Sequence, residues 1–478
     1  MRTLLMAFVL GIPMHARAED RPNVVLIVVD DLGYGELGCQ GNSEVPTPHI
    51  DSIAAEGIRF TSGYVTASYC SPSRAGLLTG RDQNRFGCDL NPVGALNDQP
   101  GVGLPASELT LASHLRSAGY ATALIGKWHL GGTSPHHPMR HGFDTFFGFR
   151  HEGHYYTSVP HDGMVTWLRR RTLPDGGTGR WIRPDGRLAI STHMGHDEPP
   201  YDADNPMLRD GQPVEVDGDL TEVFSREAVA FIRRHAERPF FLCLAYNAVH
   251  SPMQARVEDV ERFSHLEDIQ RRIFAGMLSR LDQGVGQVLE ALRDERLDRR
   301  TLVVFVSDNG GATRELTSSN RPLRGGKGDF FEGGLRVPFL ARWVGHLPAG
   351  QVEPRPVSTL DLFPTICDAS GFALPEDRTF DGINLLPMLT EAVAVPEDRV
   401  LWWRMGPLAA IRVGDWKLVR DQRSGPESSW QLFDLASDPA ETLDRAAEHP
   451  EVVESLAQLW NTRNAEMPPP STRMDRRR

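Results

Sequence analysis

The sequence is poor in cysteine, in net positive charge and in long apolar runs. Five cysteines in 478 residues are too few for disulfides to form the scaffold, although four of them (Cys39, Cys88, Cys243 and Cys367) could still pair. Acidic residues outnumber basic ones by 63 to 51, and the net charge of −12 argues against a nucleic-acid partner. No stretch beyond the N-terminal segment has the length and apolar character of a membrane span, so we expect none.

Residues 1–18 have the pattern of a cleavable secretory signal. Arg2 precedes an apolar run over residues 4–12, and Ala16-Arg17-Ala18 is a small-x-small cleavage site. The run is too short to cross a bilayer. We therefore predict cleavage after about Ala18 and a mature protein that is periplasmic or secreted.

A continuous apolar run from Asn23 to Val29 predicts a strand that is buried on both faces. Similar runs occupy 121–126, 240–244 and 301–307, with helix-like stretches at 109–117, 222–236 and 269–293. This alternation predicts an α/β fold for residues 19–397, with a large, mainly parallel or mixed sheet flanked by helices. Cys243 lies inside one of these runs, which favours a place in the core.

Two other regions have a different pattern. Residues 151–220 are rich in Asp, Gly, Pro and His without sustained periodicity, so we expect a long connection or insertion over the site. Short strand-like pieces at 400–403, 409–413, 416–420 and 430–434 precede a helix-like stretch at 450–464. Residues 398–465 are therefore predicted to form a small antiparallel sheet with a helix, followed by a disordered tail over 466–478.

The run Cys70-Ser-Pro-Ser-Arg74 places a thiol at a predicted helix start, with a cation about one turn later. Pro72 suits the first turn, and Gly80 ends the apolar helix that follows. Free N–H groups at the helix start and the Arg74 side chain favour an oxyanion of sulfate or phosphate type. An isolated cysteine is more often a small buried hydrophobe, so the pentapeptide alone leaves both interpretations open.

Polar residues follow the other buried runs. Asp30 and Asp31 come after the first strand, and Asp308 and Asn309 come after the strand at 301–307. The carboxyl ends of strands form the ligand crevice of open α/β sheets. Hard oxygen donors without a soft partner suit Ca²⁺, or less well Mg²⁺, better than zinc, although such dipeptides are also common in turns and caps.

Two lysines and two histidines are further candidates. Lys127 and His129 flank Trp128, so in an extended segment both side chains point to one side. His250 follows the strand at 240–244, and Lys327 lies in a glycine-rich stretch. Taken singly, these residues could also be ordinary edge, turn or hairpin residues.

Together these segments resemble the type I sulfatases of the alkaline phosphatase superfamily. The resemblance rests on Cys-x-Pro-x-Arg with its Leu-Thr-Gly-Arg tail, Gly-Lys-Trp-His-Leu-Gly, Asn-x-x-His, Gly-Gly-Lys-Gly, Glu-Gly-Gly-Leu-Arg-Val-Pro and Asp-Trp-Lys-Leu, which occur in the family's order from Asn23 to about Asp444. It implies a sulfuric ester hydrolase in which Cys70 is oxidised to formylglycine. A formylglycine-generating enzyme or an anaerobic sulfatase-maturing enzyme would perform that oxidation.

The resemblance also implies a metal site and a nucleophile. Asp30, Asp31, Asp308 and Asn309 carry over as ligands of Ca²⁺, together with the oxygen of the residue at Cys70. Asp308 would take a proton from the hydrated formylglycine, whose oxygen would then attack sulfur in line with the leaving alcohol. A covalent sulfate ester at position 70 would follow.

The remaining catalytic residues would handle protons and charge. His250, helped by Lys327, would protonate or stabilise the leaving oxygen, and His129 would deprotonate the remaining hydroxyl so that sulfate is expelled. Arg74 and Lys127 would hold the hydrate and sulfate oxygens. Their loss would lower turnover severely.

The export signal and the polar 151–220 segment suit an enzyme that acts on a sulfated saccharide. Its substrate-binding residues would be Lys127, His250, Lys327 and His154. Further candidates for sugar contacts, which could equally be ordinary loop residues, are Arg150, His151, Tyr155 and His161. The alternatives are a phosphodiester or phosphonate ester hydrolase of the same superfamily, because anion size barely separates sulfate from phosphate, and an inactive glycan-binding relative.

Overall fold

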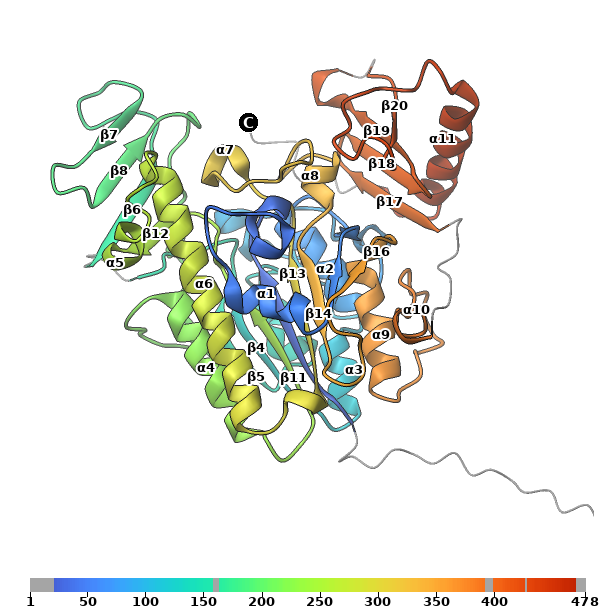
Figure 1. Ribbon diagram of the computed structural model, residues 1–478, viewed down its shortest axis with the longest axis horizontal. Coiled ribbons are helices and arrows are strands. Elements are labelled where there is room, and N and C mark those ends of the chain that lie inside the picture. The colour runs from blue at the N-terminus through green and yellow to red at the C-terminus, as the bar shows by residue number, and fades with distance from the viewer. Residues whose placement is uncertain (1–20, 158–162, 392–398, 426–427, 470–478) are drawn as a thin grey trace, which may run out of the picture.

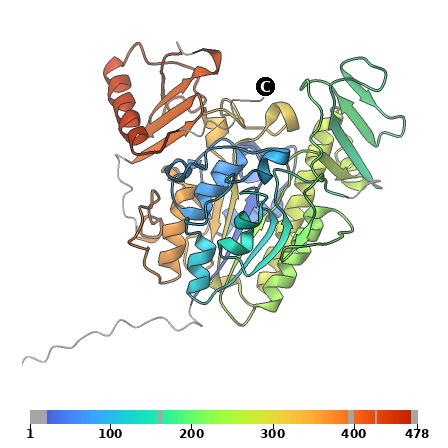
Figure 2. The same cartoon turned by 180° about the vertical axis from the view of Figure 1, so that it is seen from behind.

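A ten-stranded mixed sheet covered by helices on both faces forms the main body of the computed structural model (Figures 1 and 2). The structure describes residues 21–157, 163–391, 399–425 and 428–469. The predicted signal segment 1–18 and His161 lie outside these residues. No helix within the described ranges is both long and apolar enough to cross a membrane.

Parallel strands form the centre of the large sheet. Strand β1 (Asn23–Val29) pairs in parallel with β11 (Phe240–Ala245) on one side and with β13 (Thr301–Ser307) on the other. β4 (Ala121–Lys127) continues the parallel pairing beyond β11. The other strands are β5 (Thr145–Phe149), β9 (Leu208–Arg209), β10 (Gln212–Pro213), β14 (Phe339–Arg342), β2 (Ile58–Phe60) and β15 (Gln351–Glu353). The predicted mainly parallel or mixed sheet is confirmed.

Helices cover both faces of this sheet because β1 is apolar on both of its sides. Val25, Ile27 and Val29 pack in the core cluster that includes α1 (Pro48–Ala55), α4 (Leu220–Arg234) and α6 (Ile269–Asp294) (Figure 1). The alternating residues Val24, Leu26 and Val28 pack in the opposite cluster with α2 (Cys70–Thr79), α3 (Leu111–Ser117) and α9 (Leu362–Ala369). Because successive apolar side chains of β1 point to opposite faces, both faces of the sheet must be covered by helices, and the fold has three layers.

Local sequence sets the ends of the long helices. The side chains of Asp219 and Asp268 accept hydrogen bonds from the first-turn N–H groups of α4 and α6. α2 has Pro72 in its first turn and ends at Gly80, whose φ of +64° suits glycine. The shorter elements are β3 (Gly63–Tyr64), β16 (Val357–Ser358), α5 (Val257–Glu261), α7 (Thr313–Leu316), α8 (Glu332–Leu335) and α10 (Leu386–Thr390).

The segment over 151–220 contains short strands that the sequence analysis did not predict. β6 (Met164–Arg169), β7 (Arg180–Ile182) and β8 (Leu188–Ser191) form a four-stranded sheet with β12 (Met253–Arg256). Each strand is short, and β6 pairs with the distant β12, so no sustained local period marks them. We call this sheet the insertion sheet, because it gives residues 151–220 the form of an insertion with strands of its own.

The C-terminal region is an antiparallel meander with one helix, as predicted. Its strands are β17 (Val400–Met405), β18 (Leu408–Val413), β19 (Trp416–Asp421) and β20 (Gln431–Asp434), and its helix is α11 (Pro450–Ala465). Trp402, Ile411 and Leu418 pack against α11, whereas Trp403 and Val419 join the core of the main body. Of the predicted tail, Met467 is buried and residues 470–478 lie outside the described ranges.

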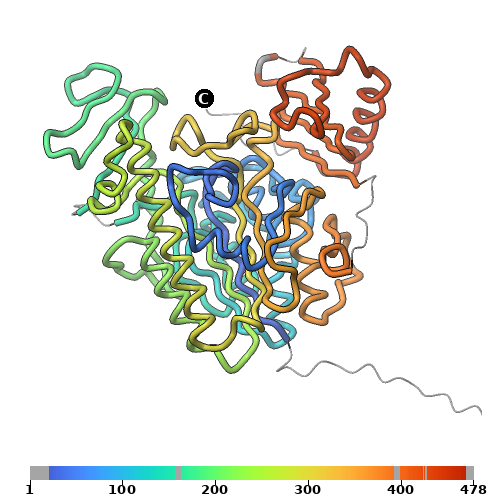
Figure 3. The backbone as a smooth tube through the Cα atoms, viewed as in Figure 1, coloured from blue at the N-terminus to red at the C-terminus, as the bar shows by residue number. Residues whose placement is uncertain are grey.

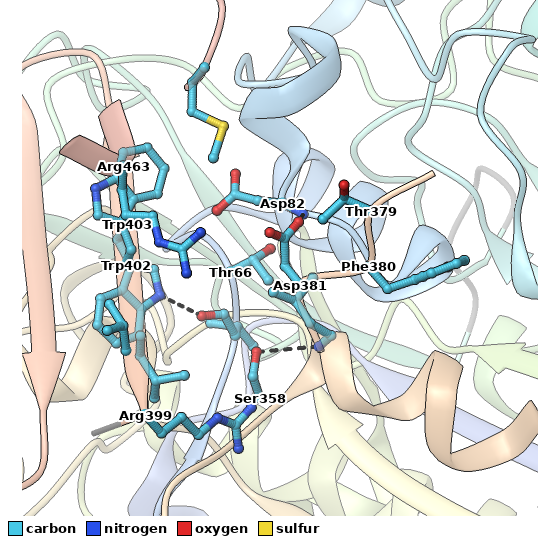
Figure 4. Close-up of a pocket in the computed structure, with 15 residues that line it drawn as sticks. Thr66, Asp82, Ser358, Thr379, Phe380, Asp381, Arg399, Trp402, Trp403 and Arg463 are labelled. Atoms are coloured by element: carbon cyan, nitrogen blue, oxygen red, sulfur yellow. Dashed lines mark hydrogen bonds between the residues drawn. The ribbon is translucent and has the colours of Figure 1, made fainter. Parts of the chain in front are cut away.

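A cavity of about 240 Å³ lies where the C-terminal sheet meets the main body (Figure 4). Trp402 and Trp403 line it from the C-terminal sheet, and Asp82 and Asp381 line it from the main body. The chain path places α7 and α8 between the insertion sheet and the C-terminal sheet (Figures 1 and 3). All five cysteines are free thiols, so the four that could have paired do not, and Cys243 is buried in β11 as expected.

Candidate functional site

The carboxyl ends of β1 and β13 bring the predicted acidic residues together. Val29 pairs with Ser307 at the last step of the register, so Asp30 and Asp308 leave the sheet side by side. The ligand atoms of Asp30, Asp31, Asp308 and Cys70 all lie within 4.8 Å of one another, and all four residues are buried. We call this group the acidic cluster.

The acidic cluster has the chemistry of a cation site. Its three carboxylates are buried, which is costly unless positive charge lies close by. Asn309 donates through Nδ2 to Asp31 Oδ1 at 2.7 Å, and its buried Oδ1 has no hydrogen-bond partner. Carboxylate and amide oxygens are the donors that hard divalent cations prefer, so these residues fit such an ion.

The first turns of α2 supply Cys70 to the acidic cluster and place Arg74 beside it. The Cys70 thiol lies 3.4 Å from Asp30 Oδ1, and its residue is 1% exposed. Arg74 donates from Nε to Asp308 Oδ2 at 2.8 Å and from Nη1 to the Lys127 carbonyl at 2.9 Å. Burial and the neighbouring Asp30 and Asp308 raise the pKa of the Cys70 thiol, so the unmodified residue is a protonated thiol and a poor nucleophile.

Lysines balance the other two carboxylates. Lys127 Nζ lies 2.5 Å from Asp30 Oδ2, and Lys327 Nζ lies 2.8 Å from Asp31 Oδ2. Burial alone would raise the pKa of Asp31, but the charge and the hydrogen bond of Lys327 outweigh it and lower the pKa to about 2. Burial and the charge of Asp30 raise the pKa of Asp308 to about 6.

The hydrogen bonds of His129 fix which ring nitrogen is free. Nε2 lies 2.8 Å from the Pro92 carbonyl, which can only accept, so Nε2 carries the proton. Burial and the charge of Lys127 lower the ring's pKa well below its usual value, so the ring is neutral. The buried Nδ1 has no hydrogen-bond partner and therefore presents a free lone pair.

His250 is held in the opposite tautomer. Its Nδ1 donates to the Ser251 carbonyl at 2.6 Å, and its Nε2 lies 3.8 Å from Asp31 Oδ2. Burial and the charges of Lys327 and Lys127 lower its pKa to about 3. The neutral ring therefore presents Nε2 as an acceptor and has no proton there to donate.

The candidates for sugar contacts make other interactions. His154 Nδ1 contacts the Tyr155 carbonyl at 2.8 Å, and its ring packs on Phe149 beside a separate cavity of about 170 Å³. His151 lies 3.2 Å from Asp98, and Arg150 donates to the Gly132 carbonyl. These contacts do not connect the three side chains to the acidic cluster.

A buried network behind His250 escaped the sequence analysis. Arg169 of β6 lies 2.7 Å from Glu315 Oε1 and donates to Ser251 Oγ at 3.2 Å. The Tyr201 hydroxyl lies 2.8 Å from Ser251 Oγ, and its ring centroid lies 5.9 Å from that of His250. Neither a motif nor a period marks Arg169, Tyr201 or Glu315, which come from β6, from the loop after β8 and from α7.

Comparisons with known proteins agree with this geometry. The Sulfatase family model matches residues 22–372. The chain is 38% identical to mouse steryl-sulfatase, over 77% of this chain and 65% of that protein, and 36% identical to human N-acetylgalactosamine-6-sulfatase, over 84% and 72%. The crystal structure of Ps i-CgsB in complex with k-i-k-neocarrahexaose has a TM-score of 0.81 and 33% identity, with 94% of both chains covered. The chain belongs to the sulfatase family of sulfuric ester hydrolases.

Proposed function

We propose that this sulfatase removes sulfate from a sulfated carbohydrate, with residue 70 as the nucleophile after its conversion to formylglycine. The supporting observation is the gathering of Cys70 and three carboxylates within 4.8 Å, beside three cationic side chains. The similar structure of Ps i-CgsB was solved with a neocarrahexaose, which supports a carbohydrate substrate. Export directed by the predicted signal at 1–18 would place the enzyme outside the cytoplasm, where it can reach external glycans.

Residue 70 requires modification because its thiol is a weak nucleophile where it lies. Oxidised to an aldehyde and hydrated, it supplies a hydroxyl oxygen that can attack sulfur. Cys70 is 1% exposed, so the maturing enzyme must reach it before the chain folds around it. That enzyme is the one protein partner that this function requires.

Asp30, Asp31, Asp308 and Asn309 would hold Ca²⁺ beside residue 70. When bound, the ion stabilises negative charge on the sulfate oxygens. Asp308 lies within 4.8 Å of residue 70, and its raised pKa suits it as the base that takes the proton of the attacking hydroxyl. Arg74, which donates to Asp308 from Nε, keeps that carboxylate oriented.

Proton transfer at the leaving group falls to Lys327 in this scheme. His250 in its present tautomer has no proton on Nε2, whereas the Lys327 ammonium carries three donors. Lys327 would donate to the leaving oxygen, and His250 Nε2 would accept from the substrate or the ammonium. His129, with its free Nδ1, would deprotonate the second hydroxyl of residue 70 so that sulfate departs, and Lys127 would hold the sulfate oxygens.

Peptide mass spectrometry around residue 70, combined with sulfate release from defined sulfated saccharides, tests the proposal. We expect the aldehyde in active protein, and a folded Cys70→Ala variant without turnover. Cys39→Ala, at a half-buried cysteine away from the acidic cluster, is the matched control and should keep full activity. A fully active protein with an unmodified thiol would refute the nucleophile, and a faster reaction on a nitrophenyl phosphate diester than on nitrophenyl sulfate would favour the phosphodiesterase alternative.

A further inference from the structure

A cavity of about 670 Å³ opens beside Lys327, and we call it the Lys327 cavity. It is lined by residues of α7 and the loop that follows, by the 325–329 loop, by Tyr69 and by Met194 of the insertion. Lys327 also contacts Asp31, and Tyr69 directly precedes Cys70. A molecule in this cavity therefore lies next to the acidic cluster.

The charges that line the Lys327 cavity do not balance one another. Lys327 pairs with Asp31. Glu315 lies 2.7 Å from Arg169, which also pairs with Glu198, and Asp329 lies 2.7 Å from Arg423, which also pairs with Asp421. Both carboxylates of the lining thus have a cation in contact, and the lining itself carries three cations against these two carboxylates.

Two arginines of the same lining have no such partner. Arg321 is exposed, and its guanidinium makes no hydrogen bond or ion pair with any residue that the structure describes. Arg314 donates from Nη2 to the His193 carbonyl at 3.1 Å and forms no ion pair within the described ranges. In a chain of net charge −12, two guanidinium groups that line one cavity and pair with none of its carboxylates favour an anion there.

The rest of the lining suits a sugar. The Tyr69 ring and the apolar side chains of Met194 and Leu323 offer surfaces on which the C–H face of a sugar ring can pack. Planar guanidinium groups bind sulfate or carboxylate through paired donors. Aromatic and apolar lining combined with unpaired arginines is the chemistry of an anionic saccharide.

We propose that the Lys327 cavity binds a second anionic group of the same glycan, through Arg314 and Arg321, while another sulfate ester of that glycan is hydrolysed at residue 70. This inference rests on the proposed function and narrows its substrate to saccharides that carry at least two anionic groups. A sulfate ester and a uronate carboxylate share the required chemistry. The kinetic comparison below distinguishes the sulfate ester from the carboxylate.

Kinetics on paired saccharides test the inference. Arg321→Gln and Arg314→Gln are compared with wild type on a monosulfated saccharide, on the same saccharide with a second sulfate, and on a sulfated saccharide with a neighbouring uronate. We expect wild type to prefer a doubly anionic substrate, and each variant to lose about tenfold in kcat/KM on it, mainly through KM. The loss on the monosulfated saccharide should stay below about twofold, and the arm with the larger loss identifies sulfate or carboxylate.

Arg171→Gln is the matched control, because it removes one charge from an arginine whose side chain is 74% exposed on the insertion. Arg171→Gln should leave the preference for the doubly anionic saccharide unchanged. Binding in the Cys70→Ala background supplies a measurement without turnover, and there Arg321→Gln should weaken binding of the doubly anionic saccharide about tenfold. The inference would be overturned if wild type showed no preference for a doubly anionic saccharide. It would also be overturned if the variants lost the same factor in kcat/KM on monosulfated and doubly anionic saccharides. Sulfate release from none of the saccharides would overturn the proposed function and the inference with it, whereas release without preference would overturn the inference alone.

Discussion

Lys417 is a buried cation that joins the C-terminal sheet to the main body. It lies on β19 with no exposed surface, and its Nζ is 2.8 Å from Glu332 Oε1 and 3.0 Å from Glu441 Oε1. Glu332, in α8, also accepts a hydrogen bond from the Tyr64 hydroxyl at 2.6 Å. Lys417→Met keeps most of the side-chain volume but leaves two buried carboxylates without their shared cation.

We expect this change to lower the free energy of unfolding by about 3 kcal/mol at pH 8. Removing one partner of a buried ion pair costs about 3–5 kcal/mol, because the remaining charge stays buried. The pKa of Glu332 gives the order of magnitude for its cations taken together. Burial alone would raise the pKa of Glu332, but Lys417 and two arginines lower it from 4.5 to about 2, which at about 1.4 kcal/mol per pKa unit corresponds to about 3 kcal/mol, shared among those cations.

The loss of unfolding free energy caused by Lys417→Met should shrink as the pH falls. Burial raises the pKa of Glu441 to about 7, so the folded state binds this proton more tightly than the unfolded chain between about pH 4.5 and 7. Lowering the pH from 8 to 6 therefore stabilises the folded state through Glu441. Without Lys417 both carboxylates gain more from protonation, so the difference between variant and wild type is largest at pH 8.

Urea unfolding followed by tryptophan fluorescence measures this effect, because Trp402, Trp403, Trp416 and Trp430 lie in the C-terminal region. The double variant Lys417→Met with Glu441→Gln should recover part of the lost unfolding free energy, since one of the two unpaired carboxylates has been removed. Arg445→Met, which removes an exposed pair with Glu448, is the control and should cost less than about 1 kcal/mol. A Lys417→Met variant within about 0.5 kcal/mol of wild type at pH 8, or a deficit that does not change with pH, would refute the reasoning.

Two further predictions concern the site. Dialysis against a chelator should lower both activity and the thermal midpoint, because three buried carboxylates within 4.8 Å lose their counter-ion, and Ca²⁺ should restore both better than Mg²⁺. An unchanged midpoint and activity after chelation would contradict a bound cation. Arg169→Met should lower kcat more on a sulfated saccharide than on nitrophenyl sulfate. It loosens Ser251 behind His250, whose Nε2 would accept from the Lys327 ammonium that protonates the leaving oxygen, whereas a nitrophenolate leaves without protonation. Equal losses on the two substrates would assign Arg169 to general stability.

The parts of the site at strand ends could be predicted from sequence because buried parallel strands have an unambiguous signal. The run Asn23–Val29 is a strand over its whole length, and so is 301–307. Once two such strands are neighbours in parallel register, Asp30 and Asp308 must emerge together. The Cys70 helix is equally local, with Pro72 at its start and Gly80 at its end.

The parts formed by distant pairing could not be predicted. β6 contributes Arg169 to the site only because it pairs with β12, far along the chain, and neither strand is long enough to show a period. The tautomer of His250 depends on where the Ser251 carbonyl points, which is a property of the folded loop. The burial of Lys417 likewise depends on how the C-terminal sheet lies against α8.

The charge arrangement explains how a chain with an excess of acidic residues can select an anion. Arg74, Lys127 and Lys327 together contact all three carboxylates of the acidic cluster, so the protein groups there balance one another. A divalent cation among the same oxygens would leave the site with a positive excess, in a buried region where electrostatic interactions are strong. Arg314 and Arg321 extend that excess into the adjoining cavity, while the surplus of acidic residues lies elsewhere. Selection of an anion is therefore a property of local pairing, and substitutions that change net charge at a distance should affect it far less than the loss of one of these five cations.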